Sequence, residues 1–255
     1  MSGRPPTTIA WEYAIESAGQ AGALNMATDA WLLRNATAGV GRLRLYRWDP
    51  PCLSFGRNEP ALRRYGREAV AQRNIATVRR PTGGRAVWHH QELTYAIAGP
   101  LDLFGSLRET YISIHEMLAD ALRACGAEVT LAGERSPKPL GSGPCFAAPV
   151  GGEVVTAGGK VVGSAQVREG SAFLQQGSVL LGNRQELVSE LVGDQTTQAV
   201  ALNDVVGRAV PFEELAGAIV ATARNAWGGS WTETEFVPPT ELAARYADEA
   251  WTWRR

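Results

Sequence analysis

The spacing of apolar residues predicts several amphipathic helices. In residues 24–38 apolar side chains recur every three or four positions, which places them on one face of a helix. Ser-Leu-Arg-Glu at 106–109 has the form of a capping box, so a second helix begins there and runs to about Cys125. Residues 211–227 predict a third helix, with proline and two acids in its first turn. Shorter helices are expected at 60–73, 185–192 and 240–246.

Extended segments separate these helices. Residues 153–156 and 160–167 are expected to be the two strands of a hairpin that turns at Gly158 and Gly159. A third strand follows at 172–174, and residues 202–209 have the composition of a loop. Further strands are expected at 43–48, 52–55, 75–80, 86–88 and 93–98. Several strands mixed with about five helices predict an α+β (mixed α/β) fold.

Length and charge restrict the possible functions. A chain of 255 residues is long enough for one large domain or two small ones. We find no repeat or domain boundary and expect a single domain over 1–255, with its core at 24–227. The 25 basic and 26 acidic side chains nearly cancel, so no global field attracts nucleic acid or a membrane surface. No apolar run approaches the roughly 20 residues of a membrane helix, and the N-terminus lacks the apolar core of a signal peptide.

The cysteines favour free thiols over disulfides. Cys52, Cys125 and Cys145 are odd in number, widely spaced and without a Cys-x-x-Cys pair, which suits a reducing cytoplasm. Cys52 lies in an expected strand and is predicted to be buried and without chemistry. Cys125 is expected to be a packing or surface residue of its helix.

The histidines do not suggest a metal site. His89 and His90 are neighbours on an expected strand and would point to opposite faces, so they cannot easily share one ion. His115 is expected to be a packing or surface residue of the helix that starts at 107. The Gly-x-Ser-x-Gly motif of many serine hydrolases is absent.

Residues 57–85 contain eight arginines, opposed only by Glu59 and Glu68. Two interpretations have about equal support: a solvated face of a helix at 60–73, or a basic patch for an acidic partner or a phosphate group. The stretch ends in Pro-Thr-Gly-Gly-Arg at 81–85, directly after an expected strand. The paired glycines can let backbone N–H groups approach a ligand or simply form a tight turn, and they match neither common nucleotide-binding glycine motif.

One cysteine and one lysine form a candidate catalytic pair. Cys145 lies between Pro144 and Pro149, where the backbone is stiff, and Lys160 follows fifteen residues later on the expected hairpin, which could fold it back. Ionising half of a thiol near neutral pH requires roughly 2 kcal/mol. An ammonium about 4 Å away supplies up to roughly 4 kcal/mol at an effective dielectric near 20. On spacing alone, a loop cysteine and an ordinary exposed lysine remain the favoured interpretation.

Four segments in order resemble the lipoate/octanoate transferase and ligase family, which is related to biotin/lipoate protein ligases. They cover most of residues 24–181 and include the glycine pair and the lysine described above. The matching segments are Leu-Asn-Met-Ala-Thr-Asp at 24–29, Leu-Arg-Leu-Tyr-Arg-Trp-Asp-Pro-Pro-Cys-Leu-Ser-Phe-Gly at 43–56, Arg-Arg-Pro-Thr-Gly-Gly-Arg-Ala-Val-Trp-His at 79–89 and Gly-Lys-Val-Val-Gly-Ser-Ala-Gln at 159–166.

Within the family, Pro-Cys-Phe-x-x-Pro at 144–149 and Glu-Leu-Thr-Tyr at 92–95 are most similar to octanoyltransferases of the cysteine-loop type. The resemblance implies one catalytic domain with mixed sheets flanked by helices. It implies that Cys145 carries an octanoyl group and that Lys160 lowers the pKa of its thiol. Implied substrate-binding residues are Arg79, Gly83, Gly84, His89, Gly163, Ser164 and Ala165.

The reaction implied by the resemblance needs no cofactor and no nucleotide. The donor would be octanoyl-acyl carrier protein, and the acceptor a lysine of a lipoyl domain, in the glycine cleavage H protein or a 2-oxoacid dehydrogenase E2. Strand residues around Val87 and Val162 are expected to line the acyl slot, and the arginine-rich stretch to dock the carrier. The expected location is the cytoplasm.

The chain departs from the family pattern in two places. His90 stands where the family commonly has aspartate, and Val-Gly-Gly at 150–152 replaces a typical Ser-x-Tyr. Alternatives are an ATP-dependent lipoate ligase, although the usual accessory C-terminal domain is not expected in this chain, and transfer between two lipoyl domains. A non-catalytic acyl-binding module or a biotin ligase fits the residues less well.

Overall fold

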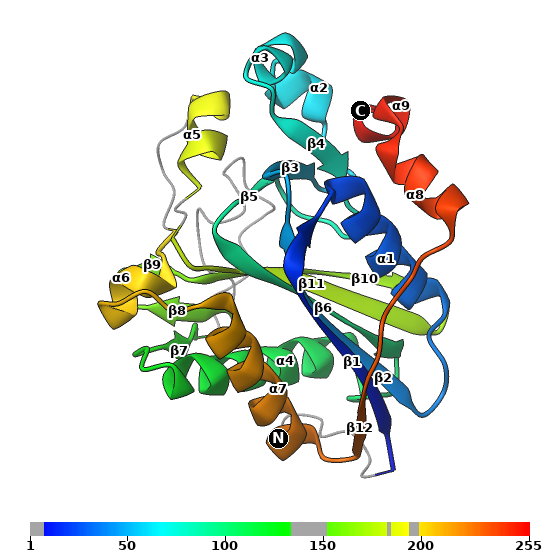
Figure 1. Cartoon of the computed structure of the whole chain (residues 1–255), viewed down its shortest axis with the longest axis vertical. Helices are drawn as coiled ribbons and strands as arrows, with labels where there is room; N and C mark the ends of the chain where they lie inside the picture. Colours follow the sequence, from blue (N-terminus) through cyan, green and yellow to red (C-terminus); the bar gives the residue numbers. More distant parts are fainter. Residues whose placement is uncertain (1–7, 134–151, 183–184, 194–198) are drawn as a thin grey trace.

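The computed structural model describes residues 8–133, 152–182, 185–193 and 199–255, and its centre is a mixed six-stranded sheet (Figure 1). Strand β1 pairs in parallel with β2 and β12, and the other neighbours are antiparallel. The order across the sheet is β10 (Val162–Glu169), β11 (Ala172–Leu180), β6 (Glu92–Pro100), β2 (Val40–Trp48), β1 (Ala10–Gln20) and β12 (Ser230–Glu233). The predicted α+β class is confirmed.

Helices cover both faces of this sheet because successive side chains of a strand point to opposite sides. Along β6, Leu93, Tyr95 and Ile97 belong to the core on one face, while Ala96 and Ala98 belong to the core on the other. The covering helices are α4 (Leu107–Ala124) and α7 (Phe212–Trp227) on the first face, and α1 (Gly22–Arg34) and α8 (Thr240–Ala247) on the second (Figure 1). None of the helices in the described part of the chain is long and apolar enough to cross a membrane.

A three-stranded sheet forms a separate layer beyond one end of α1. Its central strand β3 pairs in parallel with β4 and antiparallel with β5. Around Leu53, Phe55 and Trp253 it builds a small core with short helices. The elements are β3 (Cys52–Phe55), β4 (Ala76–Arg79) and β5 (Val87–His89), with α2 (Ala61–Arg64), α3 (Arg67–Gln72), α5 (Glu186–Val192) and α9 (Glu249–Thr252).

A second small sheet leads directly into the large one. It contains β7 (Thr130–Leu131), β8 (Val154–Thr156) and β9 (Gly159–Lys160). The chain leaves it after Lys160, passes the buried Val161 and enters β10 of the six-stranded sheet at Val162. Lys160 also forms a bridge with Ala199, just before α6 (Leu202–Val206).

Several expected boundaries are confirmed. The Ser106 side chain accepts from the Glu109 amide, and the Glu109 carboxylate accepts from the Ser106 amide, so both bonds of the capping box are present. Helix α4 ends at Ala124, before Gly126 at φ +94°. Helices α5 and α7 and strands β2, β3, β4, β5 and β6 also lie within a few residues of their expected ranges.

Other expectations were wrong. The predicted helix at 60–73 is two helices, because Tyr65 has an extended backbone, stacks on Phe55 and donates to the buried Glu59 carboxylate. The expected strand at 160–167 is divided between two sheets, and the one at 172–174 continues to Leu180. Residues 202–209 contain α6, and the first helix stops at Arg34 instead of residue 38. Strands β1, β7 and β12 were not expected.

Candidate active site

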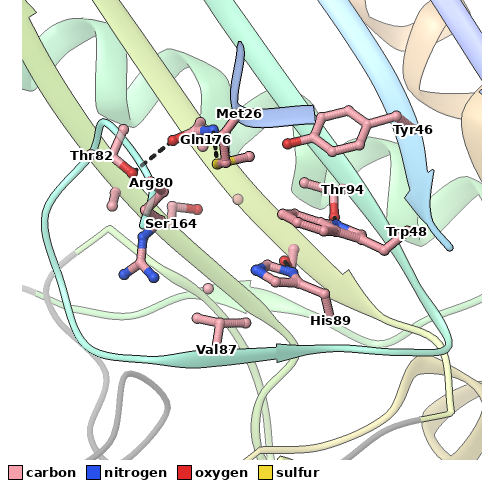
Figure 2. Close-up of a pocket in the computed structure, with 14 residues that line it drawn as sticks. Met26, Tyr46, Trp48, Arg80, Thr82, Val87, His89, Thr94, Ser164 and Gln176 are labelled. Atoms are coloured by element: carbon pink, nitrogen blue, oxygen red, sulfur yellow. Dashed lines mark hydrogen bonds between the residues drawn. The ribbon is translucent and has the colours of Figure 1, made fainter. Parts of the chain in front are cut away.

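A pocket lies where the six-stranded sheet meets the layer formed by β3, β4 and β5 (Figure 2). It encloses about 360 Å³, part of it open to solvent. One wall is apolar and the remainder is polar but mostly uncharged. The lining residues are Met26, Tyr46, Trp48, Arg80, Thr82, Val87, His89, Thr94, Gly163, Ser164, Ala165, Gln176, Gly177 and Ser178. Such a pocket can accept an apolar chain that ends in a polar acyl group.

The apolar wall is rigid. The Trp48 ring stacks on His89 with ring centroids 3.9 Å apart and planes 11° from parallel, and its Nε1 donates to Thr94 Oγ1 at 2.7 Å. Val87, which was expected near an acyl slot, lines the same pocket (Figure 2). The other residue expected there, Val162, is fully buried and is not among the lining residues.

His89 is held by hydrogen bonds on both ring nitrogens. Nδ1 lies 2.6 Å from the Glu92 carboxylate, and Nε2 lies 2.7 Å from Ser54 Oγ. Glu92 also accepts from Thr94 and Ser178, so the carboxylate receives three donors on one oxygen. With Nδ1–H directed at the carboxylate, Nε2 accepts from Ser54. His89 therefore offers the pocket its ring, not a free nitrogen.

Arg80 faces the pocket, but its donors are used by the protein. The guanidinium donates to the Gly83 and Arg85 carbonyls and to Ser54, which fixes the loop at 81–85. Gly56 touches this loop so closely that a Cβ there would lie 1.9 Å from the Gly84 oxygen. The predicted glycine pair lies in a bent segment that follows the pocket residue Thr82, with Gly84 at φ +89°.

Arg79, Gly83 and Gly84 are not among the residues that line the pocket, although all three were expected to bind substrate. Arg79 is fully buried and donates to the carbonyls of Gly56, Glu59 and Thr252. Its observed contacts tie the loop after β3 to the C-terminal helices. Among the expected substrate-binding residues, the structure brings His89, Gly163, Ser164 and Ala165 together at the pocket.

A buried acid supports the far side of the pocket. Gln176 lines it, accepts from Thr82 Oγ1 at 2.7 Å and donates to Asp29. Burial raises the pKa of Asp29, and the Arg44 charge opposes this rise. Arg44 donates to Asp29 at 2.9 Å, and Asp29 also accepts from Tyr46 at 2.7 Å. These bonds fix the two pocket residues Tyr46 and Gln176, and sequence reasoning did not predict them.

A second group of polar side chains surrounds Ser164. Its Oγ lies 2.7 Å from Tyr95 Oη and 2.8 Å from His115 Nε2, and Tyr95 accepts from Gln175. Burial, and next the positive charge of Lys160, lower the pKa of His115 to about 3, so the imidazole is neutral. The sequence suggested only a packing or surface role for His115. Its spacing on the buried face of α4 is the same as that of a core residue, so no local signal distinguished it.

Lys160 is buried beside this group. Its Nζ lies 2.7 Å from the Glu153 carboxylate, and the exposed fractions of the two side chains are 2% and 4%. Tyr111 Oη donates to the same Glu153 oxygen at 3.3 Å. Spacing alone favoured an ordinary exposed lysine, and the burial of Lys160 shows that this was wrong. The catalytic role implied by the family resemblance stays a prediction, and the acidic neighbour was not anticipated. Cys145, the other predicted catalytic residue, lies outside the described residues.

The other cysteines agree with their predictions. Cys52 and Cys125 are free and buried, and burial raises the pKa of each thiol. For Cys52 the negative charge of Glu92 raises it further, which makes this thiol unreactive. His89 is buried on β5, whereas His90 is exposed, as expected for neighbours on a strand. Among the described residues, no group of three or more His, Cys, Asp or Glu side chains is placed to hold a metal ion.

Comparison with known proteins decides the family. Residues 21–223 match the model of the lipoyl protein ligase A/B catalytic domain. The chain belongs to this family. All four sequence segments that suggested the resemblance lie within the matched residues. The expectation of this family is confirmed.

The similar family members include octanoyltransferases that match over nearly their whole length. The chain is 35% identical to octanoyltransferase LipM of Kyrpidia tusciae, covering 91% of this chain and 95% of that protein. It is also 35% identical to octanoyltransferase LipM of Moorella thermoacetica, covering 91% and 93%.

Solved structures of lipoate ligases in this family have the same fold. A bipartite lipoate protein ligase of Thermoplasma acidophilum has a TM-score of 0.74 at 19% identity, covering 96% of each chain. Lipoate-protein ligase A bound with ATP has a TM-score of 0.77 at 19% identity, covering 95% of this chain and 98% of that one. At these identities the similarity shows the fold alone.

Proposed function

We propose that the protein is an octanoyltransferase of lipoate metabolism, which moves octanoyl from a carrier thioester to a lysine of a lipoyl domain. The supporting observation is the near full-length similarity to octanoyltransferases. In the same chain, the pocket has an apolar wall and includes Ser164, and Lys160 is buried. The donor is an acyl carrier protein. The acceptor is the lipoyl domain of a glycine cleavage H protein or of a 2-oxoacid dehydrogenase E2.

The reaction proceeds in two exchanges on Cys145. The Cys145 thiolate attacks the thioester carbonyl of the donor, a new carbon–sulfur bond forms, and the carrier leaves as a thiolate that takes up a proton. The acceptor lysine amine then attacks the acyl-enzyme, loses its proton and releases the Cys145 thiolate. The first exchange replaces one thioester with another, and the second forms a more stable amide. No nucleotide is needed.

Lys160 acts as the cation that holds the thiolate. Its ammonium is buried, where electrostatic interactions are strong, and up to roughly 4 kcal/mol is available from a charge about 4 Å away. This exceeds the roughly 2 kcal/mol needed to ionise half of the thiol near neutral pH. The Glu153 carboxylate balances the lysine charge while Cys145 carries the neutral acyl group.

The pocket binds the acyl tail and stabilises the reacting carbonyl. Val87, Trp48 and Met26 supply apolar surface, and each buried CH₂ contributes roughly 0.8 kcal/mol, or about 5 kcal/mol for the whole tail before ordering costs. Gly163 and Ser164 line the same pocket, so we assign the oxyanion donors of this mechanism to their N–H groups and the Ser164 hydroxyl. The His115 and Tyr95 bonds fix the direction of the Ser164 hydroxyl.

The decisive experiment is intact mass spectrometry after mixing with octanoyl-acyl carrier protein. We expect one octanoyl adduct on the wild type and none on Cys145→Ala; an unmodified wild type refutes the proposal. Lys160→Ala should slow alkylation of Cys145 near neutral pH. An unchanged alkylation profile would remove that role from Lys160.

A competition assay tests the alternative of an ATP-dependent ligase. The enzyme is offered octanoyl-carrier on one side and octanoate with ATP on the other, with a lipoyl domain as acceptor. We expect transfer from the carrier without release of pyrophosphate. We further propose a cytoplasmic location, because a catalytic free thiol requires a reducing compartment.

A further inference from the structure

The eight arginines of residues 57–85 do not form one surface. Arg79 and Arg80 are buried, and Arg67 and Arg73 form ion pairs with Glu249 and Glu190. Arg57 is exposed and instead meets the C-terminal segment of the chain. The Arg254 guanidinium donates to the Arg57 carbonyl at 2.8 Å, and the Leu62 amide donates to the Arg255 carbonyl at 2.8 Å.

The C-terminal segment adds further arginines at this place. Arg245 and Arg254 both lie over the Trp251 ring, with guanidinium carbons 4.2 and 3.6 Å from its centroid. Arg79 lies below them, with Nε donating to the Thr252 carbonyl at 2.9 Å. We call Arg57, Arg79, Arg245, Arg254 and Arg255 the C-terminal arginine cluster. In Figure 1 its elements α8 and α9 lie beside β4, at one end of the molecule.

This cluster carries an excess of positive charge. Burial, and next the Arg254 charge, lower the pKa of Arg79 to about 10; Arg255 and Arg80 act in the same direction, and the Glu59 charge opposes them. The Arg79 Nη2 is buried and has no hydrogen-bond partner among the described residues. The Glu59 carboxylate accepts from Tyr65 and the Gly56 amide and offsets part of this charge, and Asp248 caps α9.

The cluster lies next to the pocket wall. The Arg57 amide donates to the Thr82 carbonyl at 2.8 Å, and Thr82 lines the pocket. Arg79 Nη1 donates to the Gly56 carbonyl at 2.7 Å, and Gly56 touches Gly84. A macromolecule held by these arginines would therefore be beside the loop that closes the pocket.

We propose that the C-terminal arginine cluster docks the protein that delivers the acyl group, through an acidic face of that carrier. This rests on the proposed transferase function. The chain as a whole has a net charge of −1, so an acidic partner is attracted by this local patch and not by an overall field. Such patches mainly raise the rate of encounter and fix the orientation of the partner.

The chemistry of the cluster favours the donor over the acceptor. All five cations are arginines, and the exposed ones, Arg57, Arg245 and Arg255, each offer a planar fork that binds a phosphate or a carboxylate with two parallel hydrogen bonds. A carrier that presents its acyl group on a phosphopantetheine arm offers a phosphodiester as well as acidic side chains. An acceptor lysine brings no phosphate to the site.

The test separates the two half-reactions and two kinds of donor. The triple variant Arg57→Glu/Arg245→Glu/Arg255→Glu reverses three exposed charges and leaves Arg79 and Arg254 in place. Acylation of Cys145 is measured with octanoyl-acyl carrier protein and with octanoyl-N-acetylcysteamine, a small thioester without acidic surface. Arg208→Gln is the control for a charge lost elsewhere on the surface, because Arg208 is exposed and follows α6, away from α8 and α9 in Figure 1. Arg208 is paired with Glu214, so glutamine removes its charge without setting two acids against each other.

We expect kcat/KM for the carrier-borne donor to fall by about tenfold or more in the triple variant, while that for the small thioester changes by less than about twofold. Rising salt should slow the wild type with the carrier and have little effect on the triple variant. Arg208→Gln should resemble the wild type with both donors.

Three results overturn the docking proposal. One is unchanged acylation by the carrier in the triple variant. Another is a defect confined to transfer from preloaded acyl-enzyme to a lipoyl domain, which would assign the cluster to the acceptor. If the triple variant also reacts more slowly with the small thioester, acylation is measured again in Arg57→Gln/Arg245→Gln/Arg255→Gln. An equal loss of acylation rate with both donors in this neutral variant overturns the proposal. A wild type that reacts with neither donor would instead refute the transferase function itself.

Discussion

The Lys160 ammonium lies 2.7 Å from the Glu153 carboxylate, and both side chains are almost completely buried. The two residues flank the turn between β8 and β9, so a local hairpin creates the pair. A buried ion pair contributes little net stability, but removing one partner leaves a charge in a low-dielectric environment. The pair therefore makes the position of the proposed catalytic cation sensitive to its acidic neighbour.

We predict that Glu153→Gln lowers the free energy of unfolding by about 3 kcal/mol, because the buried ammonium loses its facing carboxylate. Urea unfolding measures this change. The double variant Glu153→Gln/Lys160→Met should be more stable than Glu153→Gln alone, since no buried cation remains. If the single and double variants were equally stable, the loss in Glu153→Gln could not come from an unpaired Lys160 ammonium.

His115 makes stability depend on pH. Its folded pKa of about 3 is lower than the reference value of 6.5, so between these values the unfolded chain binds a proton that the folded protein does not. The contribution of His115 to the free energy of unfolding is at its full value above the reference pKa of 6.5. It is lost as the pH falls below that value. One such proton costs roughly 2 kcal/mol between about pH 7 and about pH 5.

The variant His115→Gln tests this dependence, since glutamine can still bond Ser164 but does not titrate. We expect it to lose less stability than the wild type when urea unfolding is repeated at about pH 5. Parallel pH profiles for both proteins would show that His115 is not the group responsible. The rate of Cys145 acylation near neutral pH should also fall more in His115→Ala than in His115→Gln.

Gly56 and Gly83, which lie near the pocket residue Thr82 but do not line the pocket, should respond differently to alanine. Gly56→Ala places a Cβ 1.9 Å from the Gly84 oxygen, so the loop at 81–85 must move. We expect a loss of about 1–3 kcal/mol in unfolding free energy, typical of overpacking, together with a slower acylation. Gly83→Ala is the control, because its Cβ meets no atom within 4 Å. A stable, fully active Gly56→Ala would contradict this contact.

Val87 should set the preferred length of the acyl chain. Val87→Phe fills part of the pocket and should favour hexanoyl over octanoyl thioesters, whereas Val87→Ala should favour decanoyl. Each CH₂ that gains or loses contact changes the rate ratio by about fourfold, from roughly 0.8 kcal/mol. Competition between thioesters of different length measures the ratio. Val162→Ala should lower stability without changing the ratio, because Val162 is buried outside the pocket lining.

The sequence predicts elements whose signals are local. The capping box at Ser106 and the apolar spacing that follows it determine α4 without help from the rest of the fold. Strand β1 was missed although the large apolar residues Trp11, Tyr13 and Ile15 stand at every second position, so a strand signal was present. Strand β12 has four mostly exposed residues and exists because it pairs with β1, more than 200 positions earlier, as Ala10 with Ser230 shows.

The candidate site, like the fold, was predicted from the sequence only in part. The sequence singled out Ser164 and Val87, and both line the pocket, although their strands β10 and β5 belong to different sheets. The partners of these residues could not be inferred. His115 reaches Ser164 across 49 positions of sequence, and Asp29 reaches Gln176 across 147, so tertiary packing alone brings them together. The division of the 160–167 strand at Val161 could not be inferred either, because Val161 and Val162 form one unbroken apolar run.

The parallel pairing of β1 with β12 has a consequence for synthesis on the ribosome. The pocket is built from residues between Met26 and Ser178, so it can form while the last quarter of the chain is still being made. The strand that closes the sheet, and the helices that bring Arg245 and Arg254, emerge only afterwards. A nascent chain that ends at α7 would therefore contain the pocket proposed for the acyl tail. It would still lack the arginines proposed to dock the acyl carrier.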